Sequence, residues 1–130
     1  MTYAPGDIVR FENAVAGKVK FHLCICVVAE STVHSFIFLN SEGAGFRDQF
    51  AIDCDRIPDL PKSRTGQTVF DCPTVHRKSA DQLSRLRPKL VCKLPKDVAA
   101  EFVPFAKRVS SMTGRDQNSL LSMLADVISA

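Results

Sequence analysis

The sequence predicts a mainly β fold, a small barrel with short helices appended and a helical segment at its C-terminal end. Short runs of β-branched and aromatic residues, separated by turn residues, fill the first two-thirds of the chain, which is typical of small all-β domains. The last third has apolar residues at helical spacing. At 130 residues the chain has the length of one domain. Residues 1–108 are expected to form the barrel with its first C-terminal helix, and residues 109–130 an extra helix of the same domain.

Six short strands are expected in order along the chain. The run at 21–28 is almost continuously apolar, which indicates a central strand buried on both faces. A Pro-Gly-Asp turn at 5–7 leads into the first strand, and the Asp-Cys-Pro sequence at 71–73 is expected to end the fifth. The expected strands are 8–11, 21–28, 34–39, 50–52, 68–70 and 89–93, and the main loops between them are 12–19, 42–45 and 55–66.

Three helices are expected after the fifth strand. Ser79 and Gln82 have the spacing of a capping box, in which the serine oxygen accepts a helical N–H and the glutamine reaches back. Pro95 and Asp97 suit the start of a second helix, which Pro104 is expected to kink. The apolar stripe of a terminal helix consists of Leu120, Leu124, Val127 and Ile128.

Composition and cysteine usage indicate a cytoplasmic protein. No run approaches the roughly 20 apolar residues of a membrane span, and the first residues have no signal-peptide pattern. An odd number of scattered cysteines favours reduced thiols. His22, Cys24 and Cys26 alternate along one expected strand and should face the same side, but this spacing is poor for a tetrahedral metal site. Burial of the two cysteines is therefore favoured, and no metal or cofactor is expected.

The positive charge is unevenly distributed. Residues 77–108 contain nine Lys and Arg but three acidic residues, whereas the first sixty residues lean acidic. This asymmetry fits a polyanion or an acidic protein as partner. A solvated face around short helices explains the same charges equally well.

Four stretches, taken in order, resemble the MazF/PemK family of bacterial toxins. They are the Pro-Gly-Asp-Ile-Val opening at 5–9, the basic residue and apolar strand at 20–27, the strand ending in a hydroxyl residue at 36–41, and the Gly, strand and Asp-x-Pro segment at 65–73. The resemblance implies an SH3-like barrel of the MazF/CcdB type. It also implies a toxin–antitoxin endoribonuclease, a hydrolase that cleaves RNA without metal by attack of the 2′-hydroxyl on the adjacent phosphate.

The same resemblance, with the residues themselves, suggests the site. Asp71 matches a position where some members place an acidic catalytic residue, and Lys20 lies near the position of the family's catalytic arginine. His22 adds a group with an ordinary pKa near neutral pH, suited to proton transfer. Catalysis is therefore assigned to Asp71, His22 and Lys20. Substrate binding is assigned to Ser41, Arg47, His76, Arg77 and Lys78.

The sequence also departs from the family pattern. Val69 stands where relatives that use the acidic residue carry an arginine, and Phe21-His22 replaces an Arg-Pro pair. Each candidate has a structural alternative: Asp71 suits a turn, His22 a satisfied strand position, Ser41 a strand end and Lys20 a solvated rim.

The partners implied by the resemblance are single-stranded RNA, an acidic antitoxin and a second copy of the chain, with no membrane. With no Trp and one Tyr, base stacking would fall to phenylalanines such as Phe46 or Phe50. The alternative function is a non-catalytic module on the same barrel that binds protein or nucleic acid, including a gyrase-directed poison. A thiol enzyme is a third alternative, although no cysteine has an obvious activating base nearby in sequence.

Overall fold

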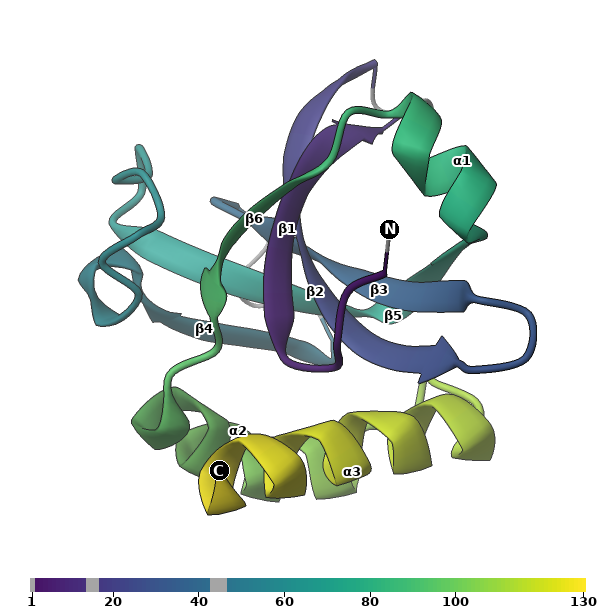
Figure 1. Cartoon of the computed structure of the whole chain (residues 1–130). Coiled ribbons are helices and arrows are strands. Elements are labelled where there is room, and N and C mark those ends of the chain that lie inside the picture. Colours follow the sequence, from purple (N-terminus) through teal and green to yellow (C-terminus); the bar gives the residue numbers. More distant parts are fainter. Residues whose placement is uncertain (1, 14–16, 43–46) are drawn as a thin grey trace.

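Six antiparallel strands form one sheet in the order β4-β5-β3-β2-β1-β6 (Figure 1). This computed structural model describes residues 2–13, 17–42 and 47–130. The strands are β1 (Asp7–Asn13), β2 (Lys18–Val28), β3 (Val33–Asn40), β4 (Gln49–Asp53), β5 (Gln67–Lys78) and β6 (Lys89–Lys93). The helices are α1 (Ala80–Arg85), α2 (Lys96–Arg108) and α3 (Gly114–Ser129). The predicted mainly β fold with three helices after the fifth strand is confirmed.

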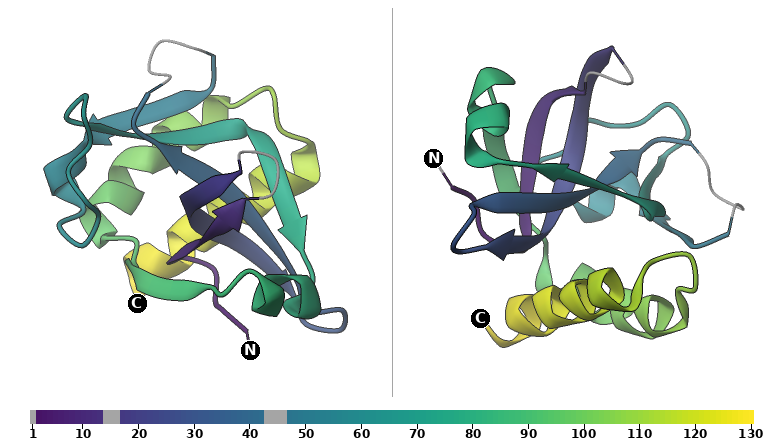
Figure 2. Two further views of the ribbon diagram at one scale, coloured as in Figure 1. Left: turned by 90° about the horizontal axis from the view of Figure 1, so that it is seen from above. Right: turned by 90° about the vertical axis from the view of Figure 1, so that its right-hand side faces the viewer.

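The sheet is open, so the predicted closure into a barrel is wrong. β4 pairs with β5 and β6 pairs with β1, which leaves each of them with a free edge within the described part of the chain. Both edge strands have five residues, and β4 runs directly into a single 3₁₀ turn, Cys54–Arg56. Closure requires the two edge strands to be hydrogen-bonded to each other. The strands curl around one another without reaching that state (Figure 2).

The fifth strand does not end at Asp71, as the sequence suggested, but continues to Lys78. Residues 72–75 of β5 lie opposite the single residue Ile37 of β3, so this stretch is a wide irregularity in the ladder. A proline lacks the N–H that a ladder needs and is tolerated at such a bulge. Pro73 therefore interrupts the pairing without ending the strand.

The prediction that His22, Cys24 and Cys26 all face the same side is wrong, because β2 contains a smaller bulge. Cys24 pairs with Phe36 and Cys26 with Ser35, so Ile25 is an extra residue on its strand. Cys24 consequently lies in one apolar cluster and Cys26 packs against the other, on the opposite face. All five cysteines are free thiols, and three of them are buried.

The main core lies between the sheet and the layer formed by α2 and α3, whereas α1 covers part of the opposite face (Figures 1 and 2). Phe102 of α2 is fully buried and stacks on Phe50 with a ring-centroid distance of 4.4 Å. Ile57 and Leu60 also belong to this core. The 55–66 segment is thus anchored inward at two points rather than being a surface loop throughout.

The helix boundaries follow the local signals. Ser79 accepts a hydrogen bond from the Gln82 backbone N–H, and the Gln82 side chain accepts one from the Ser79 N–H, so the capping box is confirmed. Pro104 lies inside α2, which continues to Arg108. Parts of the expected loops, residues 14–16 and 43–45, lie outside the described residues. None of the described helices is both long and apolar enough to cross a membrane.

Candidate functional site

One row of side chains crosses five strands on the sheet face opposite α2 and α3. The cross-strand partners are Val9 with His22, His22 with Phe38, Phe38 with Asp71, and Asp71 with Gln49. Directly opposed residues in an antiparallel pair point to the same face. The sheet therefore places Asp71 and His22 on one face, on either side of Phe38, although they are far apart in the sequence.

Lys20 lies on the same face, two residues before His22. Its Nζ donates a hydrogen bond to Asn40 Oδ1 at 3.0 Å and lies 5.5 Å from the centroid of the Phe38 ring. Burial, followed by the neighbouring charge of Lys18, lowers the pKa of Lys20, and the negative charge of Asp71 partly opposes this effect. A lysine with a lowered pKa is a better proton donor than an ordinary one.

Asp71 is half-buried and lies between Phe38 of β3 and Gln49 of β4. Gln49 Nε2 donates a hydrogen bond to Asp71 Oδ1 at 3.1 Å. The negative charge of Asp71 partly opposes the lowering of the pKa values of Lys20 and His76, so these side chains lie within electrostatic reach of one carboxylate. The structure thus brings Asp71, Lys20 and His76 together.

His22 belongs to the same row but lies beneath the surface. Its side chain is fully buried and stacks on Phe11 with ring centroids 3.7 Å apart. Burial and the nearby His76 lower the pKa of His22 to about 3. The backbone groups of Val9 and Lys20 favour the charged ring, but less than burial and His76 disfavour it. His22 is therefore neutral at physiological pH and poorly placed to exchange protons with a substrate.

Several buried polar atoms of this cluster lack a hydrogen-bond partner. They are His22 Nδ1 and Nε2, His76 Nε2 and Gln49 Oε1, and together they make up the unpartnered buried side-chain N and O atoms of the described residues. The His76 ring lies 3.9 Å from the Phe38 ring, and burial, followed by Lys78, lowers its pKa. Unpartnered buried polar groups are costly. The His22 ring is enclosed, whereas Gln49 and His76 are only half-buried, so a ligand on this face could reach those two side chains.

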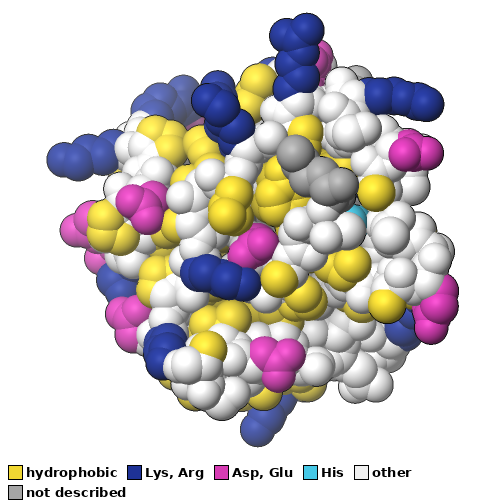
Figure 3. Space-filling view, in the orientation of Figure 1, with side chains coloured by type: hydrophobic (Ala, Val, Ile, Leu, Met, Phe, Trp, Pro, Cys, Tyr) yellow, Lys and Arg dark blue, Asp and Glu magenta, His cyan; other side chains and the backbone are white. Residues whose placement is uncertain are grey.

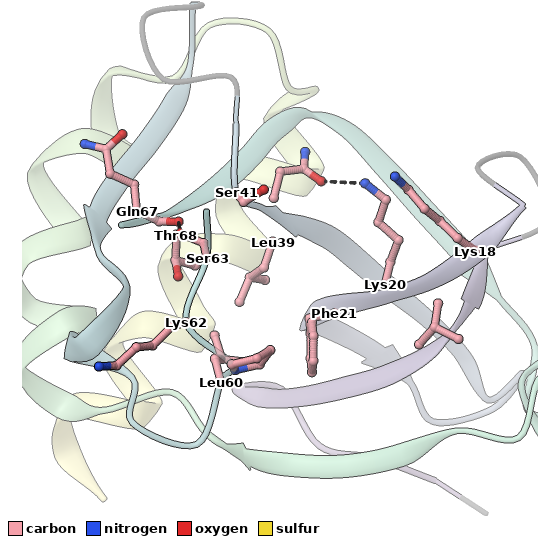
Figure 4. A pocket seen from close by; sticks show the side chains of 13 residues that line it. Lys18, Lys20, Phe21, Leu39, Ser41, Leu60, Lys62, Ser63, Gln67 and Thr68 are labelled. Atoms are coloured by element: carbon pink, nitrogen blue, oxygen red, sulfur yellow. Dashed lines mark hydrogen bonds between the residues drawn. The ribbon is translucent and has the colours of Figure 1, made fainter. Parts of the chain in front are cut away.

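A cavity of about 260 Å³ adjoins this cluster at the end of the sheet where β2 begins and β3 ends. Lys20 lines it on one side, and the hydroxyls of Ser63 and Thr68 lie across the hollow (Figure 4). Ser41, the predicted phosphate contact, is exposed at the same end and lines the cavity. Its carbonyl accepts a hydrogen bond from the Thr65 hydroxyl.

The predicted substrate contacts of β5 are divided between the two faces, because neighbouring residues on a strand point to opposite sides. His76 faces the cluster, and Lys78 lies close enough to influence its pKa. Arg77 instead faces α3, where its Nη2 lies 2.6 and 2.7 Å from the carboxylate oxygens of the buried Asp116.

Other predicted contacts also lie elsewhere. Arg47 is exposed and donates to the Ser110 hydroxyl, at the connection between α2 and α3. Phe50 is buried in the core, and Phe46 lies outside the described residues. The basic 77–108 run is spread over β5, α1, β6 and α2. On the face shown in Figure 3, Lys and Arg side chains are dispersed among acidic and apolar ones.

We expect Arg77 to matter for stability more than for RNA binding. Arg77→Ala leaves the buried Asp116 carboxylate without its partner, and because Arg77 is 43% exposed we expect a loss of about 2 kcal/mol, less than for a fully buried pair. Lys78→Ala is the matched control, which removes the same charge one residue further along. In urea unfolding, Arg77→Ala should lose more stability than Lys78→Ala. In RNA binding, Lys78→Ala should lose more affinity than Arg77→Ala. A large loss of affinity in Arg77→Ala at unchanged stability would contradict this assignment.

Two of the buried thiols have strongly raised pKa values. Burial raises the pKa values of Cys24 and Cys72 to about 12, so neither thiol is activated. Within the ranges that the structure describes, no group of three or more His, Cys, Asp and Glu side chains is placed to hold a metal ion.

Sequence reasoning missed Phe38, Asn40 and Gln49, which contact the predicted residues directly. The sequence predicts Phe38 as a strand residue, but which side chains surround it depends on how four strands pair. Comparison with protein-family models, with curated proteins and with solved structures finds no match for this chain.

Proposed function

We propose that this chain is a metal-independent endoribonuclease that cleaves single-stranded RNA, acting as the toxin of a toxin–antitoxin pair. The observation that supports it most is the placement of Asp71 and Lys20 around Phe38 on one sheet face. Each is hydrogen-bonded to a neutral amide: Asp71 accepts a hydrogen bond from Gln49, and Lys20 donates one to Asn40. A carboxylate that can take a proton and an ammonium group that can balance negative charge are the two groups that this cleavage requires.

The proposed reaction uses both groups. Asp71 takes the proton of the 2′-hydroxyl, the 2′-oxygen bonds to the adjacent phosphorus, and the bond from phosphorus to the 5′-oxygen breaks. Lys20 balances the charge of the phosphorane and gives a proton to the leaving 5′-oxygen. The products are a 2′,3′-cyclic phosphate and a 5′-hydroxyl, and water restores the two protonation states.

The remaining residues of the row have supporting roles in this proposal. His22 supports the face from below as a neutral aromatic ring, in place of the proton-transfer role predicted for it. His76, Lys78 and Ser41 contact the RNA from the two ends of the cluster. Val69, where relatives carry an arginine, is fully buried, so Lys20 carries the phosphate charge without the bidentate fork that an arginine offers.

The finer fold assignment belongs to the same proposal. The curled antiparallel sheet with a helix at the C-terminal side is consistent with an SH3-like architecture of the MazF/CcdB type that has an open seam between β4 and β6. A homodimer and an acidic antitoxin that covers the Lys20 face complete the proposed biology.

The test is cleavage of a mixed RNA pool in EDTA, with analysis of the new ends. We expect cyclic phosphate and 5′-hydroxyl ends, and no cuts by an Asp71→Asn, Lys20→Ala double variant prepared identically. The pKa of Lys20 is lowered, so Lys20 loses its proton at a pH below the ordinary lysine pKa of about 10.4. The cleavage rate should therefore begin to fall at a pH below that value. Lys20→Arg stays charged and should remove that fall. A fall that persists in Lys20→Arg would assign it to another group.

The unpartnered polar atoms also favour a second candidate, a module that binds nucleic acid without cutting it. Intact RNA in this assay, with tight binding that depends on Lys20, would support the binding module against the nuclease.

A further inference from the structure

The cavity next to Lys20 has two chemically different sides. Its floor is apolar and formed by Phe21, Leu39 and Leu60, whose side chains project into the hollow (Figure 4). Its rim carries hydroxyl and amide groups and, on one side, Lys18 and Lys20. Among the described residues, no acidic side chain lines it. Small-molecule sites typically combine such an apolar surface with a few placed polar groups.

Hydrogen bonds hold the wall of the cavity that comes from the connection between β4 and β5. The Ser63 hydroxyl donates to the Gln67 carbonyl at 2.7 Å, and the Gly66 N–H donates to the Ser63 carbonyl. The Thr65 hydroxyl ties this segment to Ser41 at the end of β3, and Leu60 anchors it in the core. The cavity is therefore formed before a ligand arrives, which lowers the entropic cost of binding.

We infer that this cavity binds one unstacked nucleobase of the RNA strand, next to the phosphate held by Lys20; this rests on the proposed function. The ring of Phe21 is only partly buried and provides an aromatic surface. Single-stranded RNA is read by stacking its bases on such rings while their edges make hydrogen bonds. Lys20 and Phe21 are consecutive on β2, so their side chains point to opposite faces of the sheet. Lys20 nevertheless lines the cavity as well as belonging to the Asp71 cluster, so a nucleotide that passes over the end of β3 can place its phosphate at Lys20 and its base in the cavity.

The rim also indicates how the base edge is read. The Ser63 hydroxyl donates its proton to the Gln67 carbonyl, so towards a ligand the Ser63 oxygen can act only as an acceptor. An N–H on the base edge fits that acceptor. Lys62 lines the cavity but points away from it (Figure 4), so the positive charge is concentrated on the side of Lys18 and Lys20. The base is thus held by Phe21 and oriented by the rim.

The test uses 2′-fluoro hexanucleotides, which lack the attacking hydroxyl and cannot be cut by the proposed reaction. Affinity is measured for A6, C6, G6 and U6 and for a hexamer with the same backbone and no bases. The wild-type protein should bind its preferred base about tenfold more tightly than the abasic strand, the scale of one stacked base. Phe21→Leu should reduce this ratio to about twofold while affinity for the abasic strand is unchanged.

The matched control is Phe105→Leu, which shortens a partly buried phenylalanine of α2 that contacts Phe50 and Phe102 away from the cavity. It should keep the wild-type ratio. The inference is overturned if Phe21→Leu keeps the ratio, if Phe105→Leu loses it equally, or if the wild-type protein binds all strands alike. If the protein binds RNA in a base-dependent way but does not cleave ordinary RNA, the nuclease proposal fails and the base-binding cavity stands. If it cleaves RNA but its binding does not depend on the bases, the base-binding cavity fails and the nuclease proposal stands.

Discussion

Replacing Asp71 by asparagine is expected to slow RNA cleavage by about 10²–10⁴-fold, the usual contribution of a positioned general base. Asparagine has the same shape, and its side-chain oxygen can keep the hydrogen bond that Gln49 Nε2 donates at 3.1 Å. The fold should therefore persist while the group proposed to take the 2′-hydroxyl proton is lost. Single-turnover cleavage with protein in excess measures this step without interference from product release.

The control for Asp71→Asn is Asp53→Asn, which removes the same charge from an exposed residue at the end of β4. It should cleave at the wild-type rate. Because the loss is confined to the chemical step, Asp71→Asn should also bind the uncleavable strands as tightly as the wild-type protein. A rate within threefold of wild type would exclude Asp71 as the base.

Replacing His22 by phenylalanine is expected to flatten the pH dependence of stability. The pKa of His22 is about 3 in the folded protein and about 6.5 when it is unfolded, so between these values the unfolded chain holds the extra proton. The free energy of unfolding of the wild-type protein should then fall as pH decreases from about 7 towards 3, by up to ~5 kcal/mol from this group alone. Phenylalanine preserves the stacking on Phe11 and cannot be protonated.

Urea unfolding followed by far-ultraviolet circular dichroism between pH 7 and pH 4 measures this effect. His76→Phe is the comparison, because His76 is half-buried and its pKa is lowered less strongly. At pH 7, His22→Phe should be at least as stable as wild type, since two unpartnered buried nitrogens are removed. It should also retain cleavage within a few-fold, in keeping with a supporting role. An unchanged acid slope in His22→Phe would place the titrating group elsewhere.

Local signals in the sequence were sufficient for most element positions. The apolar run of β2, the capping box of Ser79 and Gln82, and the bounds of β6 depend on neighbours along the chain. Such signals act over a few residues, where turn chemistry and side-chain alternation dominate. The candidate pair Lys20 and Asp71 could likewise be selected in advance from the residue types and their order along the chain.

The tertiary structure alone decided which of these residues meet. The irregularity at Pro73 keeps β5 continuous and places Asp71 beside Phe38 and His76 beside the same ring. Packing under Phe11 makes His22 a buried neutral ring, and Asp116 of α3 engages Arg77. None of these outcomes is visible in a local pattern, because each depends on strand register and helix docking between segments distant in sequence. The sequence by itself determined the strands and a set of polar candidates, whereas the pairing of β2, β3, β4 and β5 decided which candidates share one face, since register sets the side to which every strand residue points.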